Sequence, residues 1–160
     1  LHDFHAFTPT VANIRPTSRG EITISSSDTK VNPKIKMNYL STDEDRKVAA
    51  DGIKLIRKIV METNEFKKYE PEEFRPGSHL NDKEEIVKAC SHYAQTIFHP
   101  VGTCKMGNDD SAVVSDKLKV HGLNKLRVID ASIMPNITSG NTNAPTIMIA
   151  EKGADMILSA

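Results

Sequence analysis

The chain has 160 residues, of which 38% are hydrophobic and 26% charged, a composition that supports a folded core and disfavours intrinsic disorder. The 21 basic and 21 acidic residues give a formal net charge of zero, so nothing favours nucleic acid or an anionic membrane surface as a partner. No apolar run approaches the length of a transmembrane segment.

Alternating side chains predict β-strands in the first forty residues. The segments 7–16 (FTPTVANIRP) and 20–27 (GEITISSS) combine frequent β-branched residues with rough period-two alternation. A hairpin turn is expected between them at 17–20 (TSRG), where Gly20 can adopt a positive φ. A third strand is predicted over 34–40 (KIKMNYL). Three strands joined by short connections favour an antiparallel sheet with one face in water.

A helical period begins after Thr42. Thr42 and Asp45 resemble a capping box with Asp in the place of Glu, and the pattern that follows predicts a helix over 43–62. The residues expected to pack against the sheet are Ile53, Ile56 and Val60.

Two further helices and one strand are predicted in the rest of the chain. A helix starts at Asn81 or Asp82 in the segment DKEEIVKACSHYAQT, and a short buried strand is expected over 126–132 (LRVIDAS). The last helix occupies 145–160, with Pro145 suited to its first turn. The predicted fold class is therefore α+β, mainly an antiparallel β-sheet with flanking helices.

Three segments concentrate residues that can carry chemistry. They are 98–107 (FHPVGTCKMG), 126–135 (LRVIDASIMP) and 139–157 (SGNTNAPTIMIAEKGADMI). Each has Gly, Pro, Asn or Asp at a turn or helix start, where backbone can approach a ligand closely. From the residues alone, His99 is either a turn histidine or an active-site base. In the same way, Asn141 after Gly140 is either a turn residue or a hydrogen-bond donor, and Asp130 is either a cap or a ligand contact.

Four motifs together identify a family resemblance. RPTSRGEITISSSD, HPVGTCKMG, HGLNKLRVIDASIMP and NTNAPTIMIAEKGADMI resemble, in order and spacing, the C-terminal part of the glucose–methanol–choline (GMC) flavoprotein oxidoreductases. The resemblance runs from Ala12 to Ile157. It implies an FAD-dependent alcohol dehydrogenase or oxidase of the choline-dehydrogenase type, in which this chain is the C-terminal part of a larger two-domain flavoprotein.

The resemblance also implies roles for two catalytic residues. His99 matches the histidine that stands beside flavin N5 as general base, and an imidazole suits this role because it changes protonation near neutral pH. Removal of the hydroxyl proton lets the alcohol carbon release hydride to the flavin. Asn141 matches the second catalytic position, where an amide can donate a hydrogen bond to the alcohol or alkoxide oxygen.

Six residues are implied to approach the cofactor. The start of the last helix would face flavin N1 and O2, where its backbone N–H groups and dipole favour the negative charge of reduced flavin. The cofactor-binding residues implied in this way are Asp130, Ala131, Asn143, Ala144, Pro145 and Thr146.

Two other classes of function remain as alternatives. Cys90, His92, His99 and Cys104 contain zinc-ligand residue types, but their C-x-H and H-x4-C spacing is not that of a ribbon or finger, so no metal site is expected. The two cysteines fit a reduced cytoplasmic protein better than a disulfide scaffold, with peripheral membrane association left open. The second alternative is a non-catalytic fragment or partner-binding domain without its own cofactor site.

The chain contains no G-x-G-x-x-G dinucleotide fingerprint. We therefore expect FAD to be held mainly by an N-terminal FAD-binding half of the same protein, and the isolated chain to be inactive. The expected division is a starting segment (1–12), substrate-domain sheet and helices (13–98), and a catalytic loop with flavin-facing segments (99–160). The identity of the alcohol, and the choice between dehydrogenase and oxidase, stay open.

Overall fold

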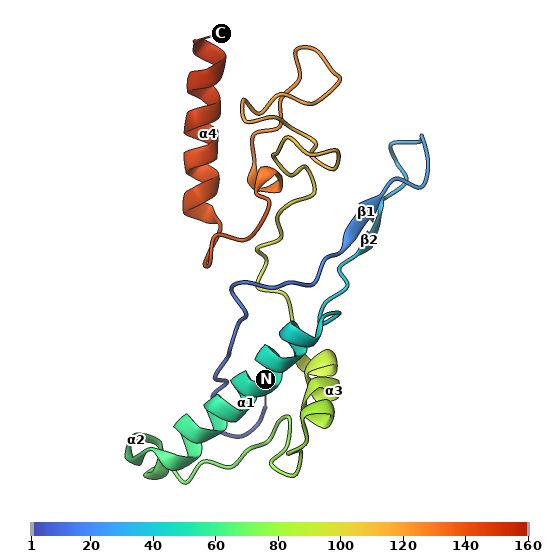
Figure 1. Ribbon diagram of the computed structural model, residues 1–160. Coiled ribbons are helices and arrows are strands. Elements are labelled where there is room, and N and C mark those ends of the chain that lie inside the picture. Colours follow the sequence, from blue (N-terminus) through green and yellow to red (C-terminus); the bar gives the residue numbers. More distant parts are fainter. Residues whose placement is uncertain (1, 160) are drawn as a thin grey trace. The chain divides into compact units, whose positions relative to one another are not determined.

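The computed structural model describes residues 2–159, which form two compact units (Figure 1). The helical unit comprises the residues up to Asn13, Thr17–Arg19 and Asn38–Gln95. The C-terminal unit comprises Ile14–Pro16, Gly20–Met37 and the residues from Thr96 onward. The elements in chain order are β1 (Glu21–Thr23), β2 (Lys34–Lys36), α1 (Asp43–Glu62), α2 (Asn64–Lys67), α3 (Lys83–Tyr93), the 3-10 helix η1 (Ala131–Ile133) and α4 (Asn143–Leu158).

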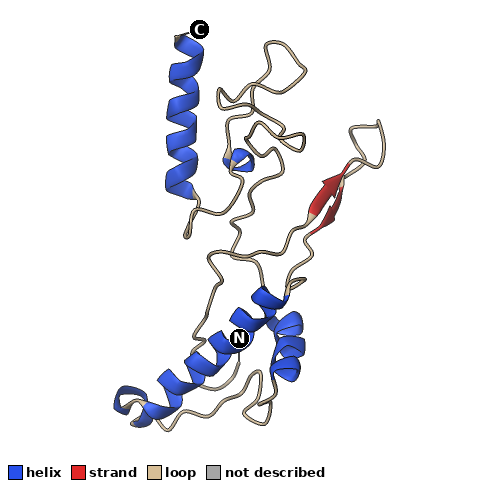
Figure 2. Ribbon diagram, in the orientation of Figure 1, coloured by secondary structure: helices blue, strands red, loops and turns tan. Residues whose placement is uncertain are grey.

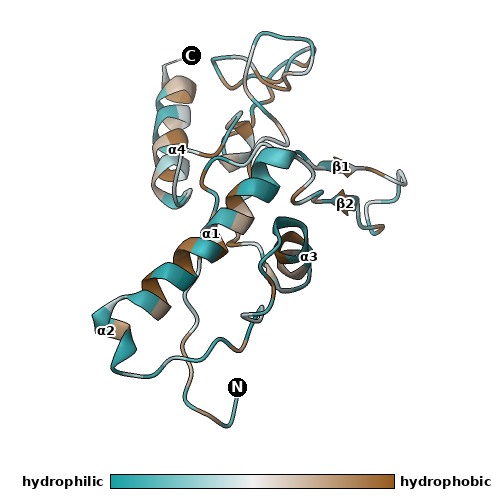
Figure 3. Ribbon diagram, turned by 60° about the horizontal axis from the view of Figure 1, so that its bottom comes forward, coloured by the Kyte–Doolittle hydropathy of each residue, from teal (hydrophilic) through white to brown (hydrophobic). Residues whose placement is uncertain are grey.

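Helix α1 confirms the prediction for 43–62. The Thr42 hydroxyl accepts a hydrogen bond from the Asp45 N–H at 3.3 Å, and three acidic residues occupy the first turn, where they complement the helix dipole. Val60 is buried, and Ile53 and Ile56 are half-buried. Figure 3 shows hydrophobic and hydrophilic residues alternating along α1 and α3, as amphipathic helices require.

The partner of α1 is not a sheet. It packs against α3, whose Ile86 and Ala89 are buried, and against α2. The expectation that α1 would cover a sheet was therefore wrong. A further contact comes from the chain start, since a Cβ added to Gly52 would lie 2.7 Å from Val11 Cγ1.

Asp45 fastens the early chain to α1. Its Oδ1 accepts from the Thr17 N–H at 2.9 Å and from Asn13 Nδ2 at 3.0 Å, and its Oδ2 accepts from the Ser18 N–H at 2.8 Å. The side chain is 4% exposed. Burial alone would raise the pKa of Asp45, but the hydrogen bonds from Ser18 and Thr17 outweigh it and lower the pKa below its ordinary value. Of the predicted capping box, only the bond from the Asp45 N–H to the Thr42 hydroxyl is formed. The Asp45 carboxylate binds Asn13, Thr17 and Ser18 instead of returning to the Thr42 backbone.

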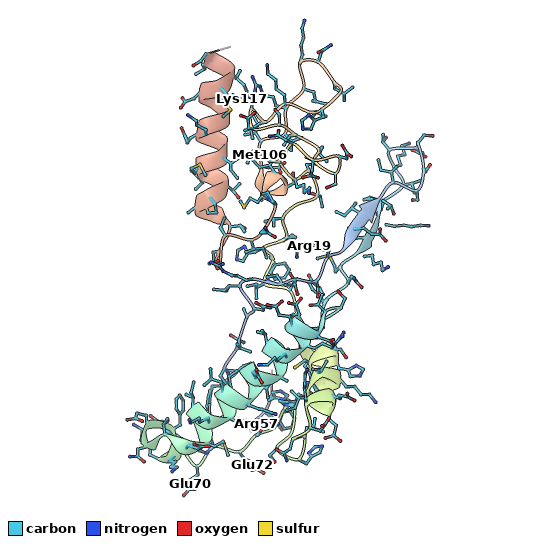
Figure 4. All side chains as sticks on the ribbon, viewed as in Figure 1. Arg19, Arg57, Glu70, Glu72, Met106 and Lys117 are labelled. Carbon is cyan, nitrogen blue, oxygen red and sulfur yellow. The ribbon has the colours of Figure 1, made fainter. Side chains whose placement is uncertain are left out.

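Arg57 of α1 fastens the loop that precedes α3 (Figure 4). Its guanidinium binds Glu73 through Nε and Nη2, at 2.9 and 3.0 Å. The same group donates to the Leu80 carbonyl at 2.7 Å and to the Gly77 carbonyl at 3.0 Å. Because both charged side chains are largely removed from water, this bidentate pair fixes the loop geometry.

The β-structure is smaller than predicted. Strands β1 and β2 pair antiparallel, with Ile22 opposite Ile35, and all six residues are exposed. The described residues thus have an α+β fold with one two-stranded sheet, in place of the mainly antiparallel sheet that we expected. Strand β2 ends at Lys36, and positive φ values follow at Asn38 and Leu40.

Two other strand predictions and one turn prediction were wrong. Residues 7–16 form no strand, since Pro9 and Pro16 lack the N–H that a ladder needs. The connection between the paired strands is 24–33, so the TSRG segment is not the hairpin turn. The segment 126–132 makes only a single antiparallel bridge, Lys119 with Arg127, before it enters η1.

The C-terminal unit has its own core and one long helix (Figure 2). Helix α4 confirms the predicted last helix, with Pro145 in its first turn. The core residues are Val114, Leu118, Ile133, Met134 and Ile149. Helix α4 contacts η1. No helix among the described residues is both long enough and apolar enough to cross a membrane.

Candidate active site

The loop that carries His99 has an unusual backbone. Phe98, directly before the histidine, has φ of 63° and is 79% exposed, a left-handed conformation that is costly for a bulky residue. Gly102 has φ of 91°, and a Cβ added there would lie 3.3 Å from the Met134 carbonyl oxygen. Glycine is therefore needed at 102 for both conformation and space.

Hydrogen bonds tie this loop to η1. The Cys104 N–H donates to the Ser132 carbonyl at 3.0 Å, and the Met106 N–H donates to the Ile133 carbonyl at 2.8 Å. Met106 lies in the C-terminal unit beside the core that η1 helps to form (Figure 4). Two of the three segments singled out from the sequence thus lie side by side.

The third segment reaches the loop through Thr142. The His99 Nδ1 lies 2.9 Å from the Thr142 hydroxyl oxygen and 3.4 Å from the Thr142 backbone nitrogen. Thr142 is 8% exposed and His99 is half-buried. Asn141, the neighbour of Thr142, is exposed. The predicted base and the predicted amide donor therefore stand on adjoining segments of one unit.

The start of α4 is open to a ligand. Its first intrahelical bond runs from the Thr146 N–H to the Thr142 carbonyl at 3.0 Å, and Pro145 has no N–H. The N–H groups of Asn143 and Ala144 precede this bond, and both residues are exposed. The Thr146 hydroxyl also donates to the Thr142 carbonyl at 2.6 Å. Backbone donors and the positive end of the helix dipole suit an anionic group here.

Asp130 has a local structural role. Its Oδ1 accepts from the Ser132 N–H at 2.8 Å and so caps η1, whose first residue is the half-buried Ala131. From the sequence, Asp130 was either a cap or a ligand contact, and the structure shows the cap. The Asp130 side chain is otherwise exposed, so the cap leaves it accessible to a ligand.

Sequence reasoning missed Thr142 and the strained Phe98. A Thr before a helix signals an N-cap, but nothing in the sequence indicated that its hydroxyl would turn to a histidine 43 residues away. Ser139 also has a positive φ, 61°, shortly before Asn141. Both positive φ values depend on tertiary packing, which local sequence does not encode.

Apart from the candidate site, the described residues contain a pocket but no metal cluster. No group of three or more His, Cys, Asp or Glu side chains there could hold a metal ion. A pocket of about 460 Å³ occurs in the helical unit, lined by residues that include Arg46, Lys83 and Glu84. It contains none of the residues predicted to act in catalysis or cofactor binding.

Comparison with known proteins decides the family. A sequence profile of the family described as GMC oxidoreductase, for its C-terminal part, matches residues 16–150. The chain belongs to the GMC oxidoreductase family. The matched range contains His99, Asn141 and the start of α4, so all of the candidate site lies inside the family region.

This GMC chain is similar to curated proteins that include two choline dehydrogenases. It is 46% identical over 155 residues to an oxygen-dependent choline dehydrogenase from Proteus mirabilis (strain HI4320), and 44% identical over 153 residues to one from Pseudomonas fluorescens (strain Pf0-1). These matches cover 97% and 96% of the chain, but only 28% and 27% of the relatives' lengths.

Among solved structures, pyridoxine 4-oxidase from Mesorbium loti matches with a TM-score of 0.84 and 35% identity, over 92% of this chain and 28% of that one. A variant of Aspergillus oryzae RIB40 formate oxidase, studied for FAD modification, also gives 0.84, at 33% identity over 97% and 29%. The chain thus spans somewhat more than a quarter of each of these proteins.

Proposed function

We propose that this chain is the catalytic C-terminal part of an FAD-dependent oxidoreductase that oxidises the CH–OH group of an alcohol. The observation that carries the proposal is the contact between His99 and Thr142. It joins the imidazole to the residue that lies in the chain between Asn141 and the exposed first residues of α4. The similarity to choline dehydrogenases makes choline the first substrate to test.

His99 is the general base of this proposal. Nδ1 is engaged by Thr142, so Nε2 is the ring nitrogen left to receive the hydroxyl proton of the alcohol. The exposed amide of Asn141 donates a hydrogen bond to the same oxygen as negative charge develops on it. Bound FAD would supply the hydride acceptor.

The residues at the start of α4 fit a flavin. The backbone N–H groups of Asn143 and Ala144 would hold the pyrimidine end of the ring, where reduced flavin carries its negative charge. Pro145 and Thr146 hold the helix start in place, the first through its fixed φ and the second through its bond to the Thr142 carbonyl. Asp130 and Ala131 contribute the neighbouring contact from η1.

A second half of the protein completes the cofactor site in this proposal. The chain has no dinucleotide fingerprint, so an N-terminal FAD-binding half would hold most of FAD, and the isolated chain would be inactive. The exposed pair β1–β2 would join a wider antiparallel sheet of that larger protein, because a two-stranded ribbon is marginal by itself. The boundaries 1–12, 13–98 and 99–160, and a cytoplasmic location, belong to the same proposal.

The test uses the full-length protein that contains this chain. It should purify with bound flavin, and choline or another primary alcohol should bleach the flavin absorbance in the absence of oxygen. Flavin that is bound but never reduced by any alcohol would contradict the proposed substrate class. A full-length protein that binds no flavin would favour a partner-binding domain instead.

A further inference from the structure

The hydroxyl of Thr142 does not cap α4, although Thr142 stands at the N-cap position of that helix. A threonine there ordinarily accepts a hydrogen bond from the N–H two or three residues further along the helix. No such side-chain bond is formed. The hydroxyl oxygen lies instead 2.9 Å from the His99 Nδ1.

Two groups of Thr142 lie near the same ring nitrogen, and they differ in the hydrogen-bonding roles that they can take. The backbone N–H, at 3.4 Å, can only donate, so it favours an Nδ1 without a proton. The hydroxyl can donate or accept, so it is the only one of the two that is also compatible with a proton on Nδ1. A neutral imidazole carries one proton, and the partner of one nitrogen decides which nitrogen holds it.

The two distances from Nδ1 show which group of Thr142 is its stronger hydrogen-bond partner. At 2.9 Å the hydroxyl contact has the usual length of a protein hydrogen bond, whereas 3.4 Å is beyond the usual range for a backbone donor. Thr142 is 8% exposed, so water offers its hydroxyl little competition. The hydroxyl is therefore the stronger partner of Nδ1.

We infer that Thr142 is a positioning residue that selects the protonation tautomer of His99. Nδ1–H donates to the Thr142 hydroxyl, and the lone pair of Nε2 is left to accept the proton of the alcohol. Without the hydroxyl, the backbone N–H becomes the only Thr142 partner of Nδ1, and the ring changes to the form with a proton on Nε2. That form cannot accept a proton at Nε2. The inference rests on the proposed role of His99 as base.

The kinetic test compares Thr142→Val, Thr142→Ser and His99→Ala in the full-length flavoprotein. Valine keeps the shape of threonine and removes the hydroxyl, whereas serine keeps the hydroxyl. Thr142→Val should slow flavin reduction at saturating choline on the order of ten- to a hundredfold, the range seen when a metal-binding histidine loses the outer hydrogen-bond partner that orients it. Thr142→Ser should restore most of the rate, with the same bound flavin. Thr29→Val, which removes an exposed hydroxyl in the connection between β1 and β2, is the matched control.

The outcomes separate the two proposals. A slow His99→Ala protein together with a Thr142→Val protein at the parent rate would overturn the role of Thr142 alone. A His99→Ala protein at the parent rate would overturn the proposed function itself. Should Thr142→Val fail to fold, ¹⁵N spectroscopy of the histidine rings in the unaltered protein decides. A proton on Nδ1 of His99 supports the inference, and a proton on Nε2 contradicts it.

Discussion

Gly153 of α4 lies directly against Ile129. A Cβ added to Gly153 would stand 2.5 Å from Ile129 Cγ2, so the absence of a side chain lets the helix approach the segment that leads into η1. Helix α4 also begins at the candidate site, which makes its seating a requirement for the geometry around His99.

Gly153→Ala should therefore destabilise the protein, although alanine is ordinarily the better helix former by about 1 kcal/mol. The overlap with Ile129 should cost more than this gain, giving a net loss of about 1–2 kcal/mol in the free energy of unfolding. Chemical denaturation measures it. Glu151→Ala, an exposed change on the same helix, should leave the midpoint nearly unchanged. A Gly153→Ala protein more stable than the parent would show that α4 is not seated this closely.

Gly102→Ala tests the shape of the His99 loop. It introduces a side chain at a positive φ and places it 3.3 Å from the Met134 carbonyl oxygen, so the loop must shift. We expect slower flavin reduction, since His99 lies three residues away. Gly122→Ala is the matched control, because Gly122 also has a positive φ but a Cβ there meets nothing within 4 Å. Both variants should lose some stability. Equal reduction rates in the two would refute a link between the loop and catalysis.

The ion pair of Arg57 and Glu73 should matter to stability. Arg57→Met removes the guanidinium from two carbonyl groups and from the largely buried Glu73 carboxylate, which keeps the hydrogen bond from the Gly77 N–H. Breaking such a pair typically costs about 3–5 kcal/mol. Thermal denaturation should show a clear drop in midpoint. Lys47→Met breaks the exposed pair with Asp51 and should have little effect. Similar losses in the two variants would contradict the distinction between buried and exposed pairs.

The lowered pKa of Asp45 should make the free energy of unfolding depend on pH in the acid range. Its pKa is lowered in the folded protein, so its contribution is complete above the unfolded pKa of about 3.9 and is lost as pH falls through the lower folded value. The difference in unfolding midpoint between the parent and Asp45→Asn should be constant from pH 7 to 5 and should shrink below pH 4.

Measuring a difference between variants removes the contribution of other carboxylates. Asp109 is one of these, since hydrogen bonds from Ser111 and Lys105 lower its pKa to about 2. A difference between parent and Asp45→Asn that grows as pH falls would contradict the predicted sign.

The three long helices could be predicted because their signals are local, whereas the short α2 and η1 were not predicted. The 3.6-residue period and the Thr42 cap gave α1 its observed bounds, and Pro145 marked the first turn of α4. Sheet partners could not be predicted, because a strand is defined by a neighbour that may lie anywhere in the chain. Residues 7–16 have the composition of a strand, yet they pack against α1. Asn13 donates a hydrogen bond to Asp45, and Val11 lies against Gly52.

The candidate site was predictable in its residue types and not in its connections. The motif around His99 and the segment around Asn141 stood out through their turn residues and their resemblance to a family. The contact between His99 and Thr142 depends on how the loop, η1 and α4 pack together. Thr142 therefore had the local signature of a helix cap and nothing more.

The rate of flavin reduction in His99→Ala, measured by rapid mixing across pH in the full-length protein, tests the central claim most directly. The variant should retain its flavin, because the cofactor would be held mainly by the other half. Reduction by alcohol should be slower by roughly a hundred- to ten-thousandfold, the typical effect of losing a general base. The deficit should shrink as pH rises, since solvent hydroxide then replaces part of the lost function. Asn141→Ala should also be slower, but without that recovery, because an amide does not titrate. A His99→Ala protein that reduces its flavin at the parent's rate would place the base elsewhere and contradict the account.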